Sequence, residues 1–489
     1  MRILSMTMLR FAVMPPVLSL ALFYCLLVFA QTVAADVEAP AFAITPYLQA
    51  GRSGAAGQMS VMWAATDSGA QYRLQWRPAG AKGWKSPLDP SKVALKHSPS
   101  HLSLATVELR NLPLGQPFDY RVIDGQKQLF QATARAPQAA CDTYNFAVFG
   151  DCGWGSAEQK ALAYRIYKDG VDFAVLTGDI VYHHGCVDEY LKHYFPVYNC
   201  EAPSPDSGAP LLRSTLFYAA PGNHDIYYGS RGMSGNFESF PHGLAYFLLW
   251  NQPLNGPKFA ALEAGSTPMA GGHKECAEFL SEAGDKFPDM ASFSFDYGNA
   301  HWTILDANPY VDWKSPKRVA WLEADLQAAS RAKWRFVAFH QPAFHSGRSH
   351  GREQQMRNIA PLMEKYKVDV VFSGHVHNYQ RSYPLTFKAF PIQGLKLFGE
   401  VINGEFVLDK TFDGVDNTKP NAPIYIVSGC GGAPTTAEPD LDVPERREPF
   451  TAKYSPLYSY TRCEMKPNGL VILQIAADGS EIDRVKITR

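Results

Sequence analysis

The sequence predicts two folded domains, an all-β sandwich followed by a layered α/β domain. The chain has 489 residues, which is too long for one ordinary hydrophobic core. Short strand-like runs separated by turn residues fill the first part, and strand-like runs alternate with helical runs in the second. With 46% hydrophobic and 19% charged residues, the composition is that of a globular protein. The formal net charge of −1 gives no electrostatic reason to expect nucleic acid as a partner.

The first 35 residues differ from the rest of the chain. Basic residues precede an apolar run from Val17 to Ala30, and the small residues Val33 and Ala35 follow it. This pattern predicts a signal peptide over residues 1–35, and hence a secreted or periplasmic protein. An uncleaved anchor is the alternative, but the apolar run is shorter than the about 20 residues of a spanning helix. We therefore expect no stable membrane anchor after cleavage.

Residues 36–138 are predicted to form the β-sandwich. Four strand-like runs are separated by turn residues: Met59–Ala65, Tyr72–Pro78, Leu104–Leu112 and Phe118–Gly125. Short strands at this spacing are typical of a sandwich. The run NLPLGQPFDYRV also resembles a strand pair of fibronectin type III domains. We expect a structural or positioning role for this domain rather than a binding role.

Residues 139–489 are predicted to form the α/β domain. Tyr144–Gly150 and Val171–Gly178 are buried-strand runs, and helices are expected near 157–168, 316–330 and 354–365. The stretch from Ile226 to Asp289 is rich in glycine and proline and poorly periodic. We interpret it as an insertion near the functional site rather than a third domain.

Five short segments of this domain share one design, because each places polar side chains directly after an apolar strand-like run. Ligands of open α/β sheets collect at the carboxyl ends of strands. A single such segment is commonly a turn or an isolated histidine, but five together predict one site. The segments are GDCG (Asp151), GDIVY (Asp179, Tyr182), GNHD (Asn223, His224), VAFH (His340) and GHVH (His375, His377).

The residue types in these segments suit a pair of metal ions. Two metals about 3.5–4 Å apart can clamp the attacking and leaving oxygens of a phosphoryl transfer. A carboxylate can bridge them, and oxygen ligands with imidazoles suit iron, manganese or zinc. The glycine before each acid is expected to let the backbone turn sharply, so that the side chain reaches the metals.

The five segments, in this order, resemble the purple acid phosphatases within the calcineurin-like metallophosphoesterases. The runs FSGHVHNYQRSYP and APIYIVSGCGGA resemble this family too. The resemblance covers the C-terminal domain well and the N-terminal sandwich loosely. It implies a sandwich of β-sheets flanked by helices. Tyr182 is the discriminating residue, because the wider superfamily often lacks a tyrosine at that position.

The resemblance also implies a role for each site residue. Asp179 would bridge the two metals. Iron(III) would be held by Asp151, Asp179, Tyr182 and His377, and a divalent metal (Fe, Zn or Mn) by Asp179, Asn223, His340 and His375. His224 would bind the phosphate by a hydrogen bond. The second catalytic histidine follows His340 shortly, and both His345 and His350 qualify. Spacing and the following Gly351 favour His350, while His345 stays open.

The function implied is that of a secreted dinuclear-metal phosphohydrolase. We expect an acid phosphatase that hydrolyses small phosphate monoesters by in-line attack of a metal-bound hydroxide. A phosphodiesterase or nucleotide phosphohydrolase with the same metal site is the alternative. A third hypothesis is a secreted binding or adhesion protein with a degenerate enzyme domain, but the complete ligand set speaks against it. The natural substrate and the oligomeric state are not predicted.

Overall fold

The computed structural model describes residues 41–489 of the chain, apart from 67–69, 99–100, 230–231 and 392–399. Residues Phe42–Arg489 form one compact unit. The predicted signal peptide, residues 1–35, lies outside the described residues. Within them, no helix combines the length and the apolar character that crossing a bilayer requires.

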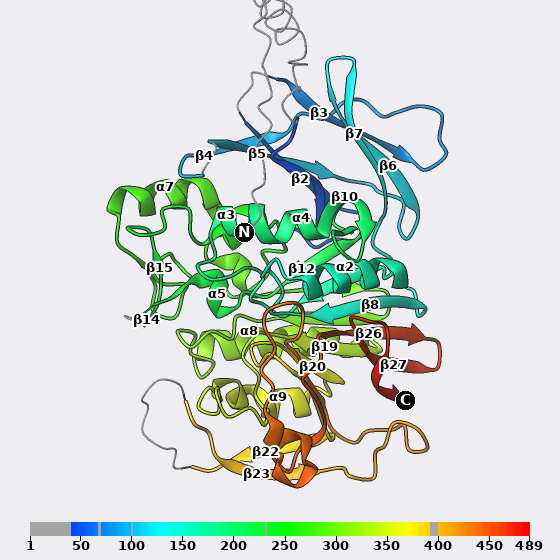
Figure 1. Ribbon diagram of the computed structural model, residues 1–489, viewed down its shortest axis with the longest axis vertical. Coiled ribbons are helices and arrows are strands. Elements are labelled where there is room, and N and C mark those ends of the chain that lie inside the picture. The colour runs from blue at the N-terminus through cyan, green and yellow to red at the C-terminus, as the bar shows by residue number, and fades with distance from the viewer. Residues whose placement is uncertain (1–40, 67–69, 99–100, 230–231, 392–399) are drawn as a thin grey trace, which may run out of the picture. The chain divides into compact units, whose positions relative to one another are not determined.

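The N-terminal part consists of two small antiparallel sheets (Figure 1). Their inner faces share one core, since Trp63 of the first sheet clusters with Trp76 and Tyr120 of the second. The sequence missed three of the strands, Ile44–Gln49, Ser91–Leu95 and Lys127–Arg135, of which the last two are exposed along most of their length. The first sheet has the order β1 (Ile44–Gln49), β2 (Met59–Thr66), β5 (Leu102–Leu109), β4 (Ser91–Leu95), and the second has β3 (Tyr72–Pro78), β6 (Pro117–Asp124), β7 (Lys127–Arg135).

Two larger sheets form the rest of the chain. One has six strands in the order β12 (Leu216–Ala219), β9 (Phe173–Leu176), β8 (Tyr144–Phe149), β26 (Ser459–Lys466), β27 (Gly469–Ala476), β28 (Glu481–Ile487). The other has seven in the order β17 (Phe293–Tyr297), β18 (Ala300–Ile304), β19 (Trp334–Ala338), β20 (Val370–Ser373), β24 (Ile424–Ser428), β21 (Tyr379–Ser382), β25 (Thr451–Ser455). Strands β12, β9 and β8 run parallel, as do β18, β19, β20 and β24. Parallel strands place their carboxyl ends at one edge of a sheet.

The two large sheets pack face to face through alternate residues of their strands. Phe146 of β8 points inward, where its ring lies 5.6 Å from that of Phe336 on β19. The neighbouring residues Phe149 and Val337 point outward, into two separate outer clusters. This alternation, which follows from the two-residue period of a strand, makes each sheet apolar on both faces.

Helices cover the outer faces of the two sheets (Figure 1). Helix α2 (Ala157–Asp169) covers the six-stranded sheet; the Ser156 side chain caps its start and left-handed Gly170 ends it. Helices α8 (Pro316–Ala328) and α9 (Ala360–Lys365) cover the seven-stranded sheet. The helix expected near 354–365 is a 3-10 turn, Gln355–Ile359, that continues into α9.

The predicted insertion, residues 226–289, is folded and contributes to the core. It contains α6 (Ala245–Leu249), whose side chains are all buried, and α7 (His273–Ala283). The Tyr246 hydroxyl donates to the Ala219 carbonyl at the end of β12, at 2.9 Å. The Tyr47 hydroxyl of β1 donates to the Leu249 carbonyl at 2.7 Å. The insertion therefore connects the N-terminal sheets to the strand that precedes Asn223.

The remaining elements are short and lie in the connections. They include α3 (Val187–Glu189), α4 (Phe195–Tyr198), α5 (Asn223–Ile226), β10 (Asn199–Ser204), β11 (Gly208–Pro210), β22 (Leu385–Ala389) and β23 (Gly404–Leu408).

Candidate metal centre

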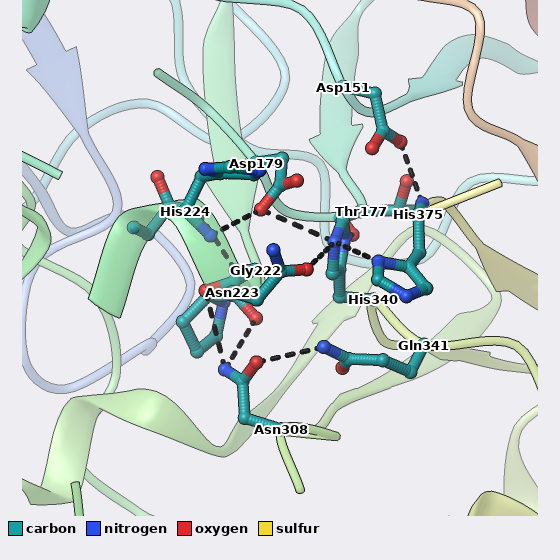
Figure 2. A network of polar contacts seen from close by, with 12 residues as sticks. Asp151, Thr177, Asp179, Gly222, Asn223, His224, Asn308, His340, Gln341 and His375 are labelled. Atoms are coloured by element: carbon teal, nitrogen blue, oxygen red, sulfur yellow. Dashed lines mark hydrogen bonds and ion pairs between the residues drawn. The ribbon is translucent and has the colours of Figure 1, made fainter. Parts of the chain in front are cut away.

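The five sequence segments meet at one edge of the two sheets. Asp151 follows β8, Asp179 follows β9, Asn223 follows β12, His340 follows β19 and His375 follows β20. Figure 2 shows these five side chains gathered in one network. The parallel direction of the strands brings them together, as the sequence predicted.

The backbone turns sharply at the polar residues themselves. Asp151, Asp179 and His375 adopt φ values of 56°, 49° and 69°, in the left-handed region that non-glycine residues rarely occupy. Such conformations cost roughly 1–3 kcal/mol each and concentrate at functional sites. The expectation that the preceding glycine makes the turn is therefore correct only in part, since Gly178 alone among the glycines before these three residues has a positive φ, of 97°.

These glycines serve mainly to allow close approach. A Cβ atom on Gly178 would lie 2.7 Å from Nδ1 of His340. A Cβ atom on Gly374 would lie 2.5 Å from Oδ2 of Asp151. Both distances are too short for a carbon atom, so a larger residue would displace the predicted ligands.

Asp151, Tyr182 and His377 form the first group of donor atoms. The Tyr182 hydroxyl lies 3.2 Å from Oδ1 of Asp151 and 3.2 Å from Nε2 of His377, and Nε2 of His377 lies 3.3 Å from the same Asp151 oxygen. His377 donates through Nδ1 to the Pro434 carbonyl at 2.8 Å. Because a carbonyl can only accept, Nε2 of the neutral ring carries a free lone pair.

Asp179, Asn223, His340 and His375 form the second group. His340 donates through Nδ1 to the Thr177 carbonyl at 2.8 Å, which leaves a lone pair on Nε2 of the neutral ring. That atom faces Oδ1 of Asn223 at 3.1 Å, Oδ1 of Asp179 at 3.3 Å and Nδ1 of His375 at 3.3 Å. His375 donates through Nε2 to Glu353 at 2.8 Å, so Nδ1 of the neutral ring carries a lone pair too. Four acceptors converge, and such a set is stable only with a positive charge among them.

Charge interactions in the buried site support this conclusion. Burial alone would lower the pKa of His340, but Asp179 outweighs it and raises the pKa to about 10. Without a metal, a proton on His340 therefore supplies the missing positive charge. Burial, followed by Asp151 and Asp179, raises the pKa of Tyr182 well above its ordinary value. Only a strongly charged metal ion could convert this phenol to a phenolate ligand.

Three buried residues that the sequence interpretation missed hold the ligand loops in place. Asp225 accepts hydrogen bonds from the amides of Ile180 at 3.1 Å and Gly222 at 2.8 Å, and so ties the Asp179 loop to the Asn223 loop. Asn308 donates to the Gly222 carbonyl at 3.4 Å and accepts from Gln341 at 2.9 Å (Figure 2). Asp225 and Gln341 directly adjoin motif residues in the sequence, a signal that could have identified them.

A loop of the seven-stranded sheet secures the first group of donors. The Gly150 amide donates to the Ser428 carbonyl at 3.0 Å, and the Ala433 amide donates to the Asp151 carbonyl at 2.8 Å. These bonds join the Asp151 turn to the run APIYIVSGCGGA. The same run leads to Pro434, the acceptor for His377.

His224 lies beside the first group of donors. Its backbone amide donates to Oδ1 of Asp179 at 2.8 Å, and its Nδ1 donates to the His183 carbonyl at 3.0 Å. Its ring lies 4.6 Å from the ring of Tyr182. The tautomer set by His183 leaves Nε2 available to a substrate.

His350 and His345 occupy different environments. The His350 ring lies 4.0 Å from that of His375, and its Nδ1 lies 3.1 Å from Oε1 of Glu353. His345 is only 6% exposed, and its Nδ1 accepts the Gly347 amide at 3.1 Å. Burial, with the nearby histidines, lowers the pKa of His345 to about 3, so this ring stays neutral. Of the two, only His350 is partly exposed and has its ring in contact with the ring of His375, a predicted ligand.

Residues 144–379 match the calcineurin-like phosphoesterase family. This part of the chain belongs to that family. Its relatives include purple acid phosphatase 23 of Arabidopsis thaliana, with 38% identity over 94 residues, or 18% of this chain and 20% of that protein. The chain thus aligns with about a fifth of the length of this relative.

Two solved structures resemble this chain over most of its length. Purple acid phosphatase PPD1 from yellow lupin (Lupinus luteus) is 15% identical with a TM-score of 0.61, covering 91% of this chain and 74% of that one. PhoD is 13% identical with a TM-score of 0.56, and the match covers 93% of this chain and 94% of PhoD. These similarities identify a metallophosphoesterase fold preceded by a β-rich region.

Proposed function

We propose that the protein is a dinuclear-metal phosphohydrolase, and specifically an acid phosphatase that hydrolyses small phosphate monoesters. One observation carries the proposal. His340 and His375 direct bare ring nitrogens at each other across 3.3 Å, together with oxygens of Asn223 and Asp179. Polar atoms in a structural core pair donor with acceptor, so this convergence of acceptors supports a cation-binding site.

The donor atoms suit two different ions. Asp151, Tyr182 and His377 would hold iron(III), because a phenol of raised pKa becomes a ligand only beside a high positive charge. Asn223, His340 and His375 would hold a divalent iron, zinc or manganese ion, and Asp179 would bridge the two. Bound ions would neutralise phosphate charge and supply a nucleophile ionised below neutral pH.

The protein's own groups would orient the ester and supply a proton. His224, with Nδ1 donating to the His183 carbonyl, would donate through Nε2 to a phosphate oxygen in its imidazolium form. His350, whose side chain is 31% exposed, would donate a proton to the departing alkoxide. Asp225 and Asn308 would keep the ligand loops in place while substrates enter and leave.

A nucleotide phosphohydrolase or phosphodiesterase is the second candidate, and one observation favours it. Trp154 lies 5.1 Å from the ring of Tyr182 and 4.8 Å from that of His183. His184 in turn stacks on Phe240 at 4.0 Å. This row of rings beside the metal centre could receive a flat leaving group such as a nucleobase.

Residues outside the metal centre complete the proposal. Residues 1–35 would direct export to the periplasm or cell exterior, and the β-rich residues 36–138 would form a fibronectin III-like sandwich that supports the enzyme domain, residues 139–489. A binding or adhesion protein with a degenerate site is disfavoured, because all seven predicted ligands are present and their donor atoms converge in two groups.

Metal analysis and substrate comparison test the proposal together. We expect close to two metal ions per chain and faster hydrolysis of para-nitrophenyl phosphate than of its bis-ester in acid. A visible absorption band that disappears in Tyr182→Phe would identify iron(III) phenolate. Fewer than about one metal per chain would contradict the dinuclear site. A colourless, active zinc or manganese protein would contradict only the iron assignment.

A further inference from the structure

We propose that Glu353 is a positioning residue that orients two histidines at once, His375 at the metal centre and His350 at the substrate. The inference rests on the proposed function and extends it. Glu353 belongs to none of the five motifs, and it lies on the same turn as His350, since its amide donates to the His350 carbonyl.

Each oxygen of the Glu353 carboxylate contacts a different ring. Oε2 lies 2.8 Å from Nε2 of His375, and Oε1 lies 3.1 Å from Nδ1 of His350. A carboxylate can only accept hydrogen bonds, so each of these two nitrogens carries the hydrogen. One side chain thus determines which nitrogen of each ring remains free.

For His375 the consequence concerns the second metal ion. With Nε2 as the donor, the lone pair lies on Nδ1, the atom that faces Nε2 of His340 at 3.3 Å. His340 and His377 donate to backbone carbonyls, whereas His375 donates to a carboxylate. A carboxylate partner makes an imidazole a more basic ligand and fixes the orientation of its ring. Glu353 would therefore strengthen the second ion's binding without touching it.

For His350 the consequence concerns proton delivery. Its Nδ1 donates to Glu353, so a proton passed to the leaving group would come from Nε2 of the imidazolium form, which the carboxylate stabilises. The Glu353 amide donates to the His350 carbonyl at 3.0 Å, so both side chains are held on one turn. The ring of His350 lies 4.0 Å from that of His375, which the same carboxylate holds. The distance between the proton donor and the metal centre is thus fixed through Glu353.

Substitutions of Glu353 in the full-length protein separate these effects. Glu353→Ala removes both hydrogen bonds, and in Glu353→Gln only the amide oxygen can still accept one. His350→Ala removes the proton donor and leaves the Glu353–His375 contact. Glu400→Ala is the matched control: Glu400 is also part-buried, accepts bonds from Lys314 at 2.5 Å and Asn358 at 3.1 Å, and contacts none of the predicted ligands.

The measurement is metal content per chain during titration with a chelator, accompanied by kcat and KM on para-nitrophenyl phosphate. We expect Glu353→Ala to lose one of two ions at roughly 10–100-fold lower chelator concentration than the unsubstituted protein, and to keep the other. Glu353→Gln should be intermediate. His350→Ala and Glu400→Ala should retain both ions, and His350→Ala should reduce kcat with little change in KM.

Two results would overturn the inference. One is that Glu353→Ala loses its first ion at a chelator concentration within about twofold of the one that the unsubstituted protein needs. The other is a Glu353→Ala variant that binds metal more weakly but regains the kcat of the unsubstituted protein when metal is added in excess. In that case Glu353 would not act through His350. If the unsubstituted protein itself binds fewer than about one ion per chain, the proposed function fails instead. Thermal unfolding of each variant distinguishes loss of metal from loss of fold.

Discussion

His340 and His375 approach each other nitrogen to nitrogen, with Nε2 of one 3.3 Å from Nδ1 of the other. Their opposite nitrogens already donate, one to the Thr177 carbonyl and the other to Glu353. Two lone pairs at this distance repel each other unless a positive charge lies between them. The hydrogen bonds behind the rings therefore prepare the space between them for a cation.

Asp179→Asn tests the bridging role proposed for this carboxylate. The asparagine has nearly the same shape but lacks the charge that balances two cations. Metal-dependent charge stabilisation amounts to several kcal/mol, so we expect kcat to fall about 1000-fold. The second ion should be lost on gel filtration. An Asp179→Asn protein with full activity and two ions would refute the dinuclear mechanism.

Gly178→Ala tests whether close approach determines the geometry of the site. The new methyl group would meet His340 Nδ1 at 2.7 Å and the Gly222 amide nitrogen at 2.8 Å. We expect a loss of about 1–3 kcal/mol in the free energy of unfolding and loss of metal. The control is Gly170→Ala, because Gly170 also has a positive φ, of 63°, but has open space around its Cα. Gly170→Ala should lower stability by about 1 kcal/mol and leave the metal content unchanged.

The position of the candidate site was predictable from the sequence because the predicted ligands lie in the loops that follow buried strands. Asp151 and His375 each follow a run of apolar residues, and parallel strands bring such ends together. Glu353 and Asn308 were not predictable in the same way. Their roles depend on contacts with residues distant in sequence, and no local pattern marks a polar side chain that supports a ligand. Strand β7 was missed because alanines occupy most of the inward positions of its alternating pattern, and alanine is uncommon in strands.

The two histidines that follow His340 should respond differently to substitution. His350→Ala removes a partly exposed imidazole beside the metal centre, so we expect kcat to fall about 100–10,000-fold with the fold intact. His345→Ala removes a buried ring that accepts the Gly347 amide, and should chiefly lower stability, by about 1–3 kcal/mol. Kinetics and thermal melting on both variants decide the matter. A larger loss of kcat in His345→Ala, at unchanged stability, would reverse the assignment.

Stability should decrease in mild alkali because of His301, which lies on β18 away from the metal centre. Its Nδ1 lies 2.7 Å from Asp296 and its Nε2 lies 3.1 Å from Asp325. Burial lowers the pKa of His301, but the hydrogen bonds to the two carboxylates outweigh it and raise the pKa to about 9. The folded pKa exceeds the unfolded value, so this stabilisation is complete below about pH 6.5 and is lost as the pH rises through about 9.

The full effect on the free energy of unfolding is at most roughly 3 kcal/mol, since one pKa unit corresponds to about 1.4 kcal/mol. Urea unfolding at pH 6 and pH 9 measures it. The His301→Gln variant should be less stable at pH 6 and should show a flatter pH dependence. An equal decrease in the two proteins would assign the alkaline loss to other groups.

Asp483→Ala should destabilise the fold, because it breaks a buried ion pair. Asp483 accepts from Arg381 at 2.6 Å and from the Tyr379 hydroxyl at 2.8 Å, and both charged side chains are 10% exposed. Removing one partner leaves the arginine charge buried and unpaired, which costs about 3–5 kcal/mol. The matched control is Asp285→Ala, which breaks an exposed pair with Arg52, where the side chains are 59% and 52% exposed. We expect that control to change the free energy of unfolding by less than about 1 kcal/mol. Similar losses in the two variants by urea unfolding would show that burial does not govern the strength of the Arg381–Asp483 pair.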